Sequence, residues 1–204
     1  MTIAIIKYGM GNVASVQKVL KKLGYTSIIT SDASEIESAD LILLPGVGSF
    51  KKGIDNLESL GLINLLTKEV IENKKPFIGI CLGMQLVATF GNELERKKGL
   101  GWIDGEVIKI ESKKGLRVPH LGWNTVSSTS SKSLYNEFTG EDYYFIHSYH
   151  FKPKDYNEVV FTVNYGGDVV AALEKENIHV MQFHPEKSQQ AGLNLLKKII
   201  NKYA

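Results

Sequence analysis

The chain has 204 residues, of which 24 are lysine or arginine, 22 are acidic and 43% are hydrophobic. This length fits one domain of residues 1–204, and the balanced charge argues against nucleic acid or a membrane surface as partner. A lone cysteine, Cys81, excludes an intramolecular disulfide and a cysteine-based zinc cage. No run of about 20 apolar residues and no basic leader are present. We therefore expect a cytoplasmic protein of mixed α/β structure.

The first half of the sequence alternates short apolar runs with amphipathic segments. Strands are predicted over Thr2–Tyr8, Tyr25–Thr30, Ala39–Leu44 and Pro76–Ile80. Helices are predicted over residues 13–23 behind an Asn12 cap, over Phe50–Val70 as one or two helices around Gly61, and over Cys81–Phe90. Continuous apolar strands between such helices are typical of a mostly parallel central sheet flanked by helices.

The pattern changes after Phe90. Short apolar runs separated by turn residues predict further strands over Trp102–Ile110, Tyr143–His147, Val159–Val163, Val169–Leu173 and Ile178–Phe183. These short strands indicate a mixed or antiparallel sheet region in the second half of the chain. A helix over Gly192–Tyr203 is expected to close it.

The cysteine lies in a segment that is typical of a nucleophile. Gly79-Ile80-Cys81-Leu82-Gly83 has the G-x-nucleophile-x-G pattern between a predicted strand and a predicted helix. A tight turn there requires glycines, which allow neighbouring backbone to approach closely. The start of the new helix directs backbone amides and the positive end of its dipole at the thiol. The alternative interpretation is a buried structural cysteine.

A second segment supplies the other groups that thiol catalysis needs. His184-Pro185-Glu186 follows a predicted strand, and in extended backbone His184 and Glu186 share one face. A carboxylate in that position can hold the imidazole in one tautomer while the other ring nitrogen faces a thiol. Taken alone, His184 would be read as a surface histidine, but the two segments together favour a Cys–His–carboxylate site.

These segments, Gly79–Gln85 and His184-Pro185-Glu186, resemble the class I, triad-type glutamine amidotransferases. The resemblance implies that Cys81 is the nucleophile, His184 the base and acid, and Glu186 the group that orients His184. It implies a substrate, glutamine, and no metal or organic cofactor. The substrate-binding residues that it implies, including the oxyanion loop after the third strand, are Gly46, Val47, Gly48, Leu82, Gln85, Glu93 and Ser148.

Three further segments narrow the resemblance to the glutaminase subunits of imidazole glycerol phosphate synthases. They are Tyr8-Gly9-Met10-Gly11-Asn12, Val118–Asn124 and Tyr144–Tyr149. Such subunits supply ammonia to a (β/α)₈-barrel cyclase that makes imidazole glycerol phosphate and an aminoimidazole carboxamide ribotide in histidine biosynthesis. The resemblance implies a heterodimer with that cyclase and an interface that includes Met10, Asn12, Trp123 and Lys187.

Three other functions compete with this one. A paralogous glutaminase could feed a sugar-modifying synthase of surface-polysaccharide biosynthesis; Lys7, where the family usually has aspartate, is the only hint. The Lys7 change is better explained as a harmless substitution at a strand end. A silent scaffold is disfavoured by the intact triad, and a cysteine peptidase by Gln85 and the oxyanion loop. Structural hydrogen bonding is the default role for His120, His147 and His150.

Overall fold

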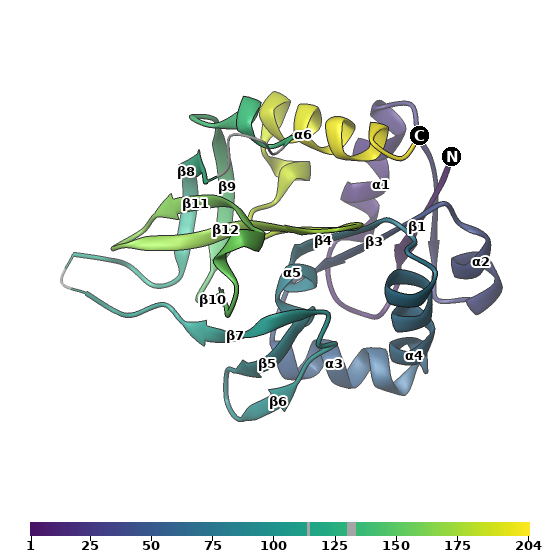
Figure 1. Cartoon of the computed structure of the whole chain (residues 1–204), viewed down its shortest axis with the longest axis horizontal. Coiled ribbons are helices and arrows are strands. Elements are labelled where there is room, and N and C mark those ends of the chain that lie inside the picture. Colours follow the sequence, from purple (N-terminus) through teal and green to yellow (C-terminus); the bar gives the residue numbers. More distant parts are fainter. Residues whose placement is uncertain (114, 130–133) are drawn as a thin grey trace.

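The fold is built on one twisted nine-stranded sheet. The structure is a computed structural model that describes residues 1–113, 115–129 and 134–204. Its strand order is β2-β1-β3-β4-β13-β12-β11-β8-β9 (Figure 1). The first five are parallel, and the last four continue the sheet antiparallel. The strands are β1 (Thr2–Ile6), β2 (Thr26–Thr30), β3 (Leu41–Gly46), β4 (Phe77–Cys81), β8 (His120–Ser128), β9 (Asp142–His147), β11 (Val159–Asn164), β12 (Asp168–Lys175) and β13 (Ile178–Met181).

Helices cover both faces of the parallel part of the sheet (Figure 1). One core contains Ile3 and Ile5 of β1, and the other contains Ala4 and Ile6, because alternate side chains of a strand point to opposite faces. On the first side lie α1 (Val13–Lys22) and α6 (Gln189–Asn201). On the second lie α2 (Ala33–Ser38), α3 (Phe50–Ser59), α4 (Leu62–Thr67) and α5 (Leu82–Leu86).

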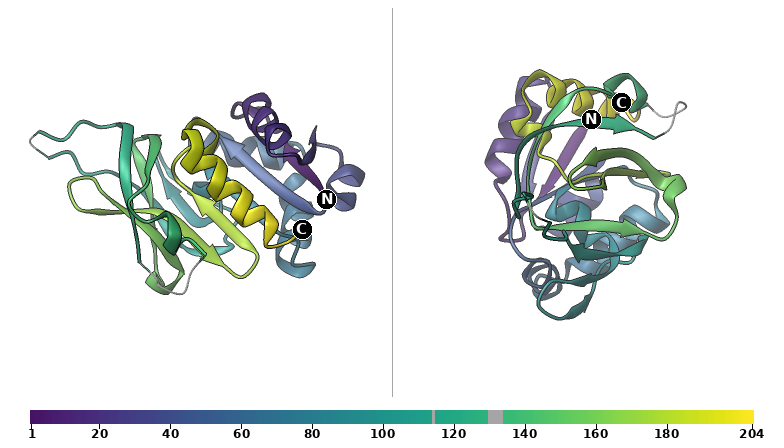
Figure 2. Two further views of the ribbon diagram at one scale, coloured as in Figure 1. Left: turned by 90° about the horizontal axis from the view of Figure 1, so that it is seen from above. Right: turned by 90° about the vertical axis from the view of Figure 1, so that its left-hand side faces the viewer.

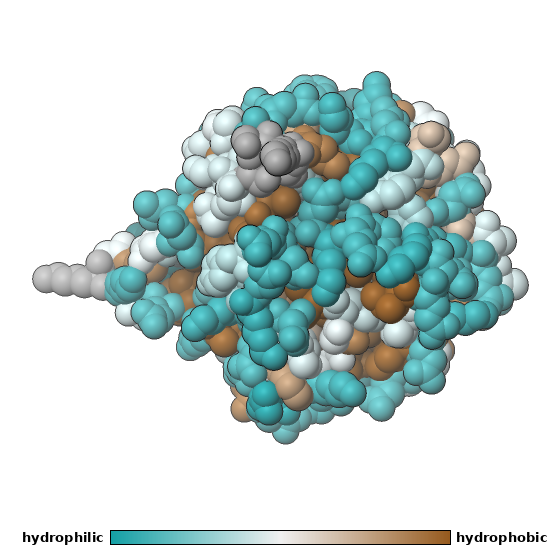
Figure 3. All heavy atoms as spheres, in the orientation of Figure 1, coloured by the Kyte–Doolittle hydropathy of each residue, from teal (hydrophilic) through white to brown (hydrophobic). Residues whose placement is uncertain are grey.

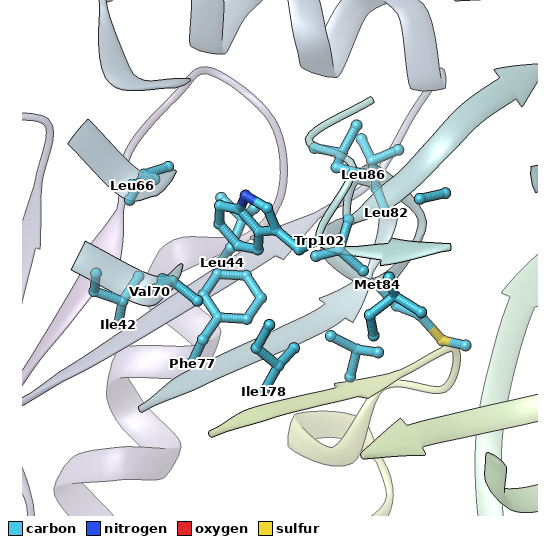
Figure 4. Packing of buried hydrophobic residues seen from close by; sticks show 14 of the residues in the cluster. Ile42, Leu44, Leu66, Val70, Phe77, Leu82, Met84, Leu86, Trp102 and Ile178 are labelled. Carbon is cyan, nitrogen blue, oxygen red and sulfur yellow. The ribbon is translucent and has the colours of Figure 1, made fainter. Parts of the chain in front are cut away.

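A separate four-stranded sheet lies on the side of α3 and α5 (Figure 1). Its strands are β10 (Tyr149–Pro153), β7 (Ile103–Lys109), β5 (Ala88–Asn92) and β6 (Arg96–Lys98), in that order. Trp102, just before β7, meets Phe77 of β4 edge to face at 5.0 Å between ring centroids (Figure 4). This contact joins the small sheet to the core of the large one.

Short helical turns complete the fold: a π-helical turn at Lys68–Glu72 and 3₁₀ turns at Asn136–Phe138, Tyr156–Glu158 and Pro185–Lys187. The two ends of the chain lie near each other in both views of Figure 2. The face in Figure 3 is mostly hydrophilic, with small separate apolar areas. Among the described residues, no helix has both the length and the apolar character needed to cross a membrane.

The sequence predicts the α/β class, the parallel strands and the main helices correctly. Asn12 caps α1 by accepting a hydrogen bond from the Ser15 amide at 3.1 Å, and Gly61, with φ 68°, separates α3 from α4. Both features follow from ordinary helix start and stop chemistry.

The structure confirms a mixed sheet region, since β13 pairs parallel with β4 and antiparallel with β12. Two expectations about elements are corrected. The predicted helix over Cys81–Phe90 is wrong beyond Leu86: Ala88 starts strand β5, which pairs with β7. The elements α2, β6, β8 and β10 are additional to the prediction, and α6 begins at Gln189 rather than at Gly192.

Candidate active site

Cys81 stands at the sharp turn from β4 into α5. Its backbone has φ 55° and ψ −106°, a conformation that L-residues rarely adopt and that costs conformational energy. The flanking glycines make the turn possible, because a Cβ on Gly79 would lie 2.8 Å from the Gly83 carbonyl oxygen. A Cβ on Gly83 would lie 1.9 Å from the Leu44 carbonyl oxygen. The two glycines therefore let α5 pack directly on β3 and β4.

His184 comes to the same edge of the sheet from the neighbouring strand. The strands β4 and β13 pair in parallel, with Ile80 opposite Met181, so the segments that leave their carboxyl ends lie side by side. The Nδ1 atom of His184 is 2.8 Å from Oε1 of Glu186, and both side chains are buried. The Nε2 atom has no hydrogen-bond partner among the described residues. Glu186 thus fixes one ring nitrogen of His184, and the other nitrogen is free to bond to a reacting group.

The electrostatics of His184 favour its protonated form. Burial disfavours the charge, but the Cys81 and Glu186 side chains outweigh it and raise the pKa of His184 to about 9. The charges of Cys81 and Glu186 thus act on the same imidazole. The structure brings together the three residues of the predicted triad, although they come from two segments about one hundred positions apart.

A chain of buried amides connects the nucleophile to the neighbouring cleft. Gln182 donates through Nε2 to Sγ of Cys81 at 3.7 Å, and its Oε1 accepts from Nε2 of Gln85 at 3.0 Å. Gln85 also donates to the carbonyl of Tyr149 at 3.0 Å. Sequence reasoning missed Gln182, although a buried polar side chain directly after β13 and before Phe183-His184 was a usable signal.

A cleft of about 400 Å³, open to solvent, lies beside this chain of amides. It contains four of the predicted substrate-binding residues, Gly48, Gln85, Glu93 and Ser148. Ser49 also lines the cleft. The backbone amide of the next residue, Phe50, donates to Oε2 of Glu93 at 2.7 Å. Carboxylate, amide and backbone groups converge here, as a small zwitterionic ligand requires.

A second, narrower cleft lies on the other side of the oxyanion loop. Its lining residues are Asn12, Pro45, Gly46, Val47, Ile80, His184, Glu186 and Lys187. Two of the four predicted interface residues, Asn12 and Lys187, are thus brought beside the predicted triad. A third, Met10, contacts the same loop, because a Cβ on Gly48 would lie 2.7 Å from its Cε. Leu82, the remaining predicted substrate-binding residue, begins α5 directly after Cys81.

Trp123, the fourth predicted interface residue, lies on an apolar part of the surface. It is 48% exposed on β8, opposite Tyr144 of β9, and the two ring centroids are 6.0 Å apart. Leu121 and Ile146 form the adjacent cross-strand pair and are also exposed. The Nζ atom of Lys187 lies 5.8 Å from the centre of the Tyr144 ring. Trp123 and Lys187 therefore share Tyr144 as a neighbour.

Two of the histidines without an assigned role form a hydrogen-bonded pair. Nδ1 of His120 lies 2.9 Å from Nε2 of His147, whose Nδ1 lies 2.8 Å from the Tyr149 carbonyl oxygen. Burial lowers the pKa of His120 to about 4 and that of His147 to about 3, so both are neutral at pH 7. Burial also lowers the pKa of His150. Lys7 is exposed at the end of β1.

Comparison with known proteins accounts for this arrangement. Residues 4–202 match the family described as glutamine amidotransferase class-I. The chain belongs to this family. Imidazole glycerol phosphate synthase subunit HisH 2 of Methanococcus maripaludis is 43% identical over 97% of this chain and 98% of its own length. Subunit HisH 1 of Campylobacter jejuni strain RM1221 is 45% identical over 97% of this chain and 98% of its own length.

Solved amidotransferase structures share the fold. A crystal structure of a glutamine amidotransferase superposes with a TM-score of 0.74 at 17% identity, covering 95% of this chain and 96% of its own. PurLQS from Thermotoga maritima gives a TM-score of 0.73 at 18% identity, covering 100% of this chain and 99% of its own. As a class I amidotransferase, the chain has the α/β fold expected from its sequence, with the large sheet and a second, smaller one.

Proposed function

We propose that this amidotransferase is the glutaminase subunit of an imidazole glycerol phosphate synthase and works in the cytoplasm with a (β/α)₈-barrel cyclase. The observation that carries the proposal is the meeting of Cys81, His184 and Glu186 at the carboxyl ends of β4 and β13. The proposal is also supported by the relatives named as imidazole glycerol phosphate synthase subunits, because each matches this chain over nearly the full length of both proteins.

Glutamine binds in the open cleft with its side-chain amide above Cys81. Glu93 is positioned to attract the α-ammonium group, and backbone around Ser148 holds the α-carboxylate. Both Nε2 hydrogens of Gln85 are engaged by Tyr149 and Gln182, so its Oε1 is the atom left for the substrate. These contacts place the scissile carbonyl next to the sulfur, which converts attack into a step within one complex.

The reaction then proceeds through a thioester. Cys81 transfers its proton to His184, and the thiolate attacks the amide carbon. Backbone amides of Leu82 and of the loop Gly46-Val47-Gly48 stabilise the oxyanion; one such donor typically contributes about 10²–10³ in rate. His184 protonates the leaving nitrogen, ammonia departs, and His184 activates the water that releases glutamate.

The ammonia leaves toward the cyclase, which docks over the surface around Trp123, Met10, Asn12 and Lys187. The exposed aromatic and aliphatic side chains of β8 and β9 have the composition of an interface core, with Lys187 as a polar neighbour. Transfer inside the complex keeps ammonia from protonation in bulk water. The cyclase uses it to form imidazole glycerol phosphate and an aminoimidazole carboxamide ribotide.

Glutamate release from glutamine tests this function. We would measure it with the chain alone, with the barrel cyclase of the same genome, and with that cyclase plus its ribulosyl nucleotide ligand. A sharp rise with cyclase and ligand, abolished by Cys81→Ala, supports the proposal. No rise, while a glutamine analogue still labels Cys81, would keep the glutaminase chemistry and reassign the ammonia to another acceptor, such as a sugar-modifying synthase.

A further inference from the structure

Tyr8 carries a hydroxyl group that the reaction described above does not use. The side chain follows β1 and is 1% exposed. Its Oη has no hydrogen-bond partner among the described residues. A buried hydroxyl without a partner loses its bonds to water and gains none in return, so it destabilises the fold. A buried polar group of this kind in a native structure calls for an explanation, and a role in catalysis is one.

The residues around this hydroxyl indicate that its partner is a group in the active site. A Cβ on Gly46 would lie 2.2 Å from Oη of Tyr8 and 2.9 Å from Cβ of Leu82. Gly46 is paired with Cys81 across the register of β3 and β4, and Leu82 directly follows Cys81. The hydroxyl therefore lies between the oxyanion loop and the first turn of α5, beside the nucleophile.

The ionisation of Tyr8 is consistent with a donor. Burial, and then the charge of Cys81, raise the pKa of Tyr8 far above its ordinary value. The second effect has the sign expected when a thiolate at Cys81 disfavours ionisation of the phenol. Tyr8 thus stays protonated wherever the enzyme works, so its hydroxyl keeps a hydrogen that it can donate in a hydrogen bond.

We propose that the Tyr8 hydroxyl donates a hydrogen bond to Sγ of Cys81 when the sulfur is ionised. In the thiol form the S–H group is directed at the Ile146 carbonyl at 4.0 Å. When the S–H bond breaks, its proton passes to Nε2 of His184 and the electron pair stays on sulfur, which then only accepts. Oη–H of Tyr8 and Nε2–H of Gln182 become its two neutral donors. This role rests on the proposed function of Cys81.

Tyr8→Phe removes only the hydroxyl, and the chain offers a matched control. Tyr143 is also fully buried with an unpartnered hydroxyl, but its pKa is raised by burial and by Glu141, with no contribution from Cys81. We would measure the rate of Cys81 alkylation by iodoacetamide between pH 5 and 10 for the wild type, Tyr8→Phe and Tyr143→Phe. Glutamine turnover and thermal unfolding of the same proteins complete the comparison.

The expected result for Tyr8→Phe is a shift of the alkylation midpoint to higher pH by about 0.5–1 unit, and a rate about 3–10-fold lower at pH 7. The kcat for glutamine falls by a similar factor while KM stays constant. Tyr143→Phe matches the wild type in all three, and the Tm of both variants stays equal or rises by up to about 4 °C.

Two outcomes would overturn the inference. One is a Tyr8→Phe protein whose alkylation profile follows that of the wild type; the other is an equal shift in Tyr143→Phe. Either result would leave the glutaminase proposal intact. Failure of the proposed function looks different, because then wild-type Cys81 alkylates no faster than an ordinary buried thiol and releases no glutamate.

Discussion

Replacing Glu186 with glutamine isolates the charge that supports His184. The substitution keeps the shape of the side chain but removes the carboxylate that contacts Nδ1 at 2.8 Å. Glu186 and Cys81 raise the pKa of His184 to about 9 from its ordinary 6.5 despite burial, so together they favour the imidazolium by about 3 kcal/mol. Losing a sizeable share of this with Glu186 should lower kcat at pH 7 by roughly 10-fold.

The pH profile of Cys81 alkylation is the assay that separates this electrostatic effect from a loss of folding. For Glu186→Gln the midpoint moves to higher pH, because a weaker imidazolium stabilises the thiolate less. Glu176→Gln is the control, since Glu176 is 62% exposed and pairs with Lys74 at the surface. A Glu186→Gln enzyme with wild-type kcat and wild-type alkylation profile would refute the reasoning.

Gly83→Ala places a Cβ 1.9 Å from the Leu44 carbonyl oxygen and should lower the free energy of unfolding by about 3 kcal/mol or more in urea titrations; an unchanged midpoint would contradict the packing of α5. His120 and His147 have pKa values of about 4 and 3 in the folded state. Below pH 6.5 each histidine is protonated in the unfolded chain but stays neutral in the folded one. The free energy of unfolding is therefore highest above pH 6.5 and decreases as the pH falls toward the folded-state values, by about 2 kcal/mol per histidine at pH 5. His120→Asn should reduce this pH dependence of urea unfolding by that amount, and an equal dependence would show that His120 is charged when folded. Trp123→Ala should weaken binding to the cyclase by about 2 kcal/mol, roughly 30-fold in Kd by calorimetry, with no change in Tm. Unaltered affinity would place Trp123 outside the interface.

The sequence predicts the parallel half of the fold well because each strand and helix there carries its own local signal. Asn12 caps α1, and the strands are uninterrupted apolar runs. The same local reasoning failed after Leu86, where the helix ends and β5 begins. Ala88 is in a strand because it pairs with Ile103 of β7, and the residues next to Ala88 in the sequence do not indicate this pairing. Boundaries set by tertiary pairing are the part of a fold that periodicity does not encode.

For the site, the sequence identifies groups that form recognisable spacings and misses groups that reach the site across strands. Gly79, Gly83, His184 and Glu186 stand at fixed offsets within two short segments, so their chemistry is readable. Gln182 contacts Cys81 only because β13 lies beside β4. The sequence marks Gln182 only as a polar residue at the end of an apolar run, and its contact with Cys81 follows from the register of the sheet.

The adjacency of β4 and β13 also determines when the enzyme can become active. Ribosomes complete the nucleophile turn about one hundred residues before they make His184, and β13 can pair with β4 only after that stretch of chain has been made. Until then Cys81 lacks the base that would ionise it. A nascent chain, or one cut before β13, thus exposes no reactive thiolate. The site is therefore complete only when residues from both halves of the chain have come together.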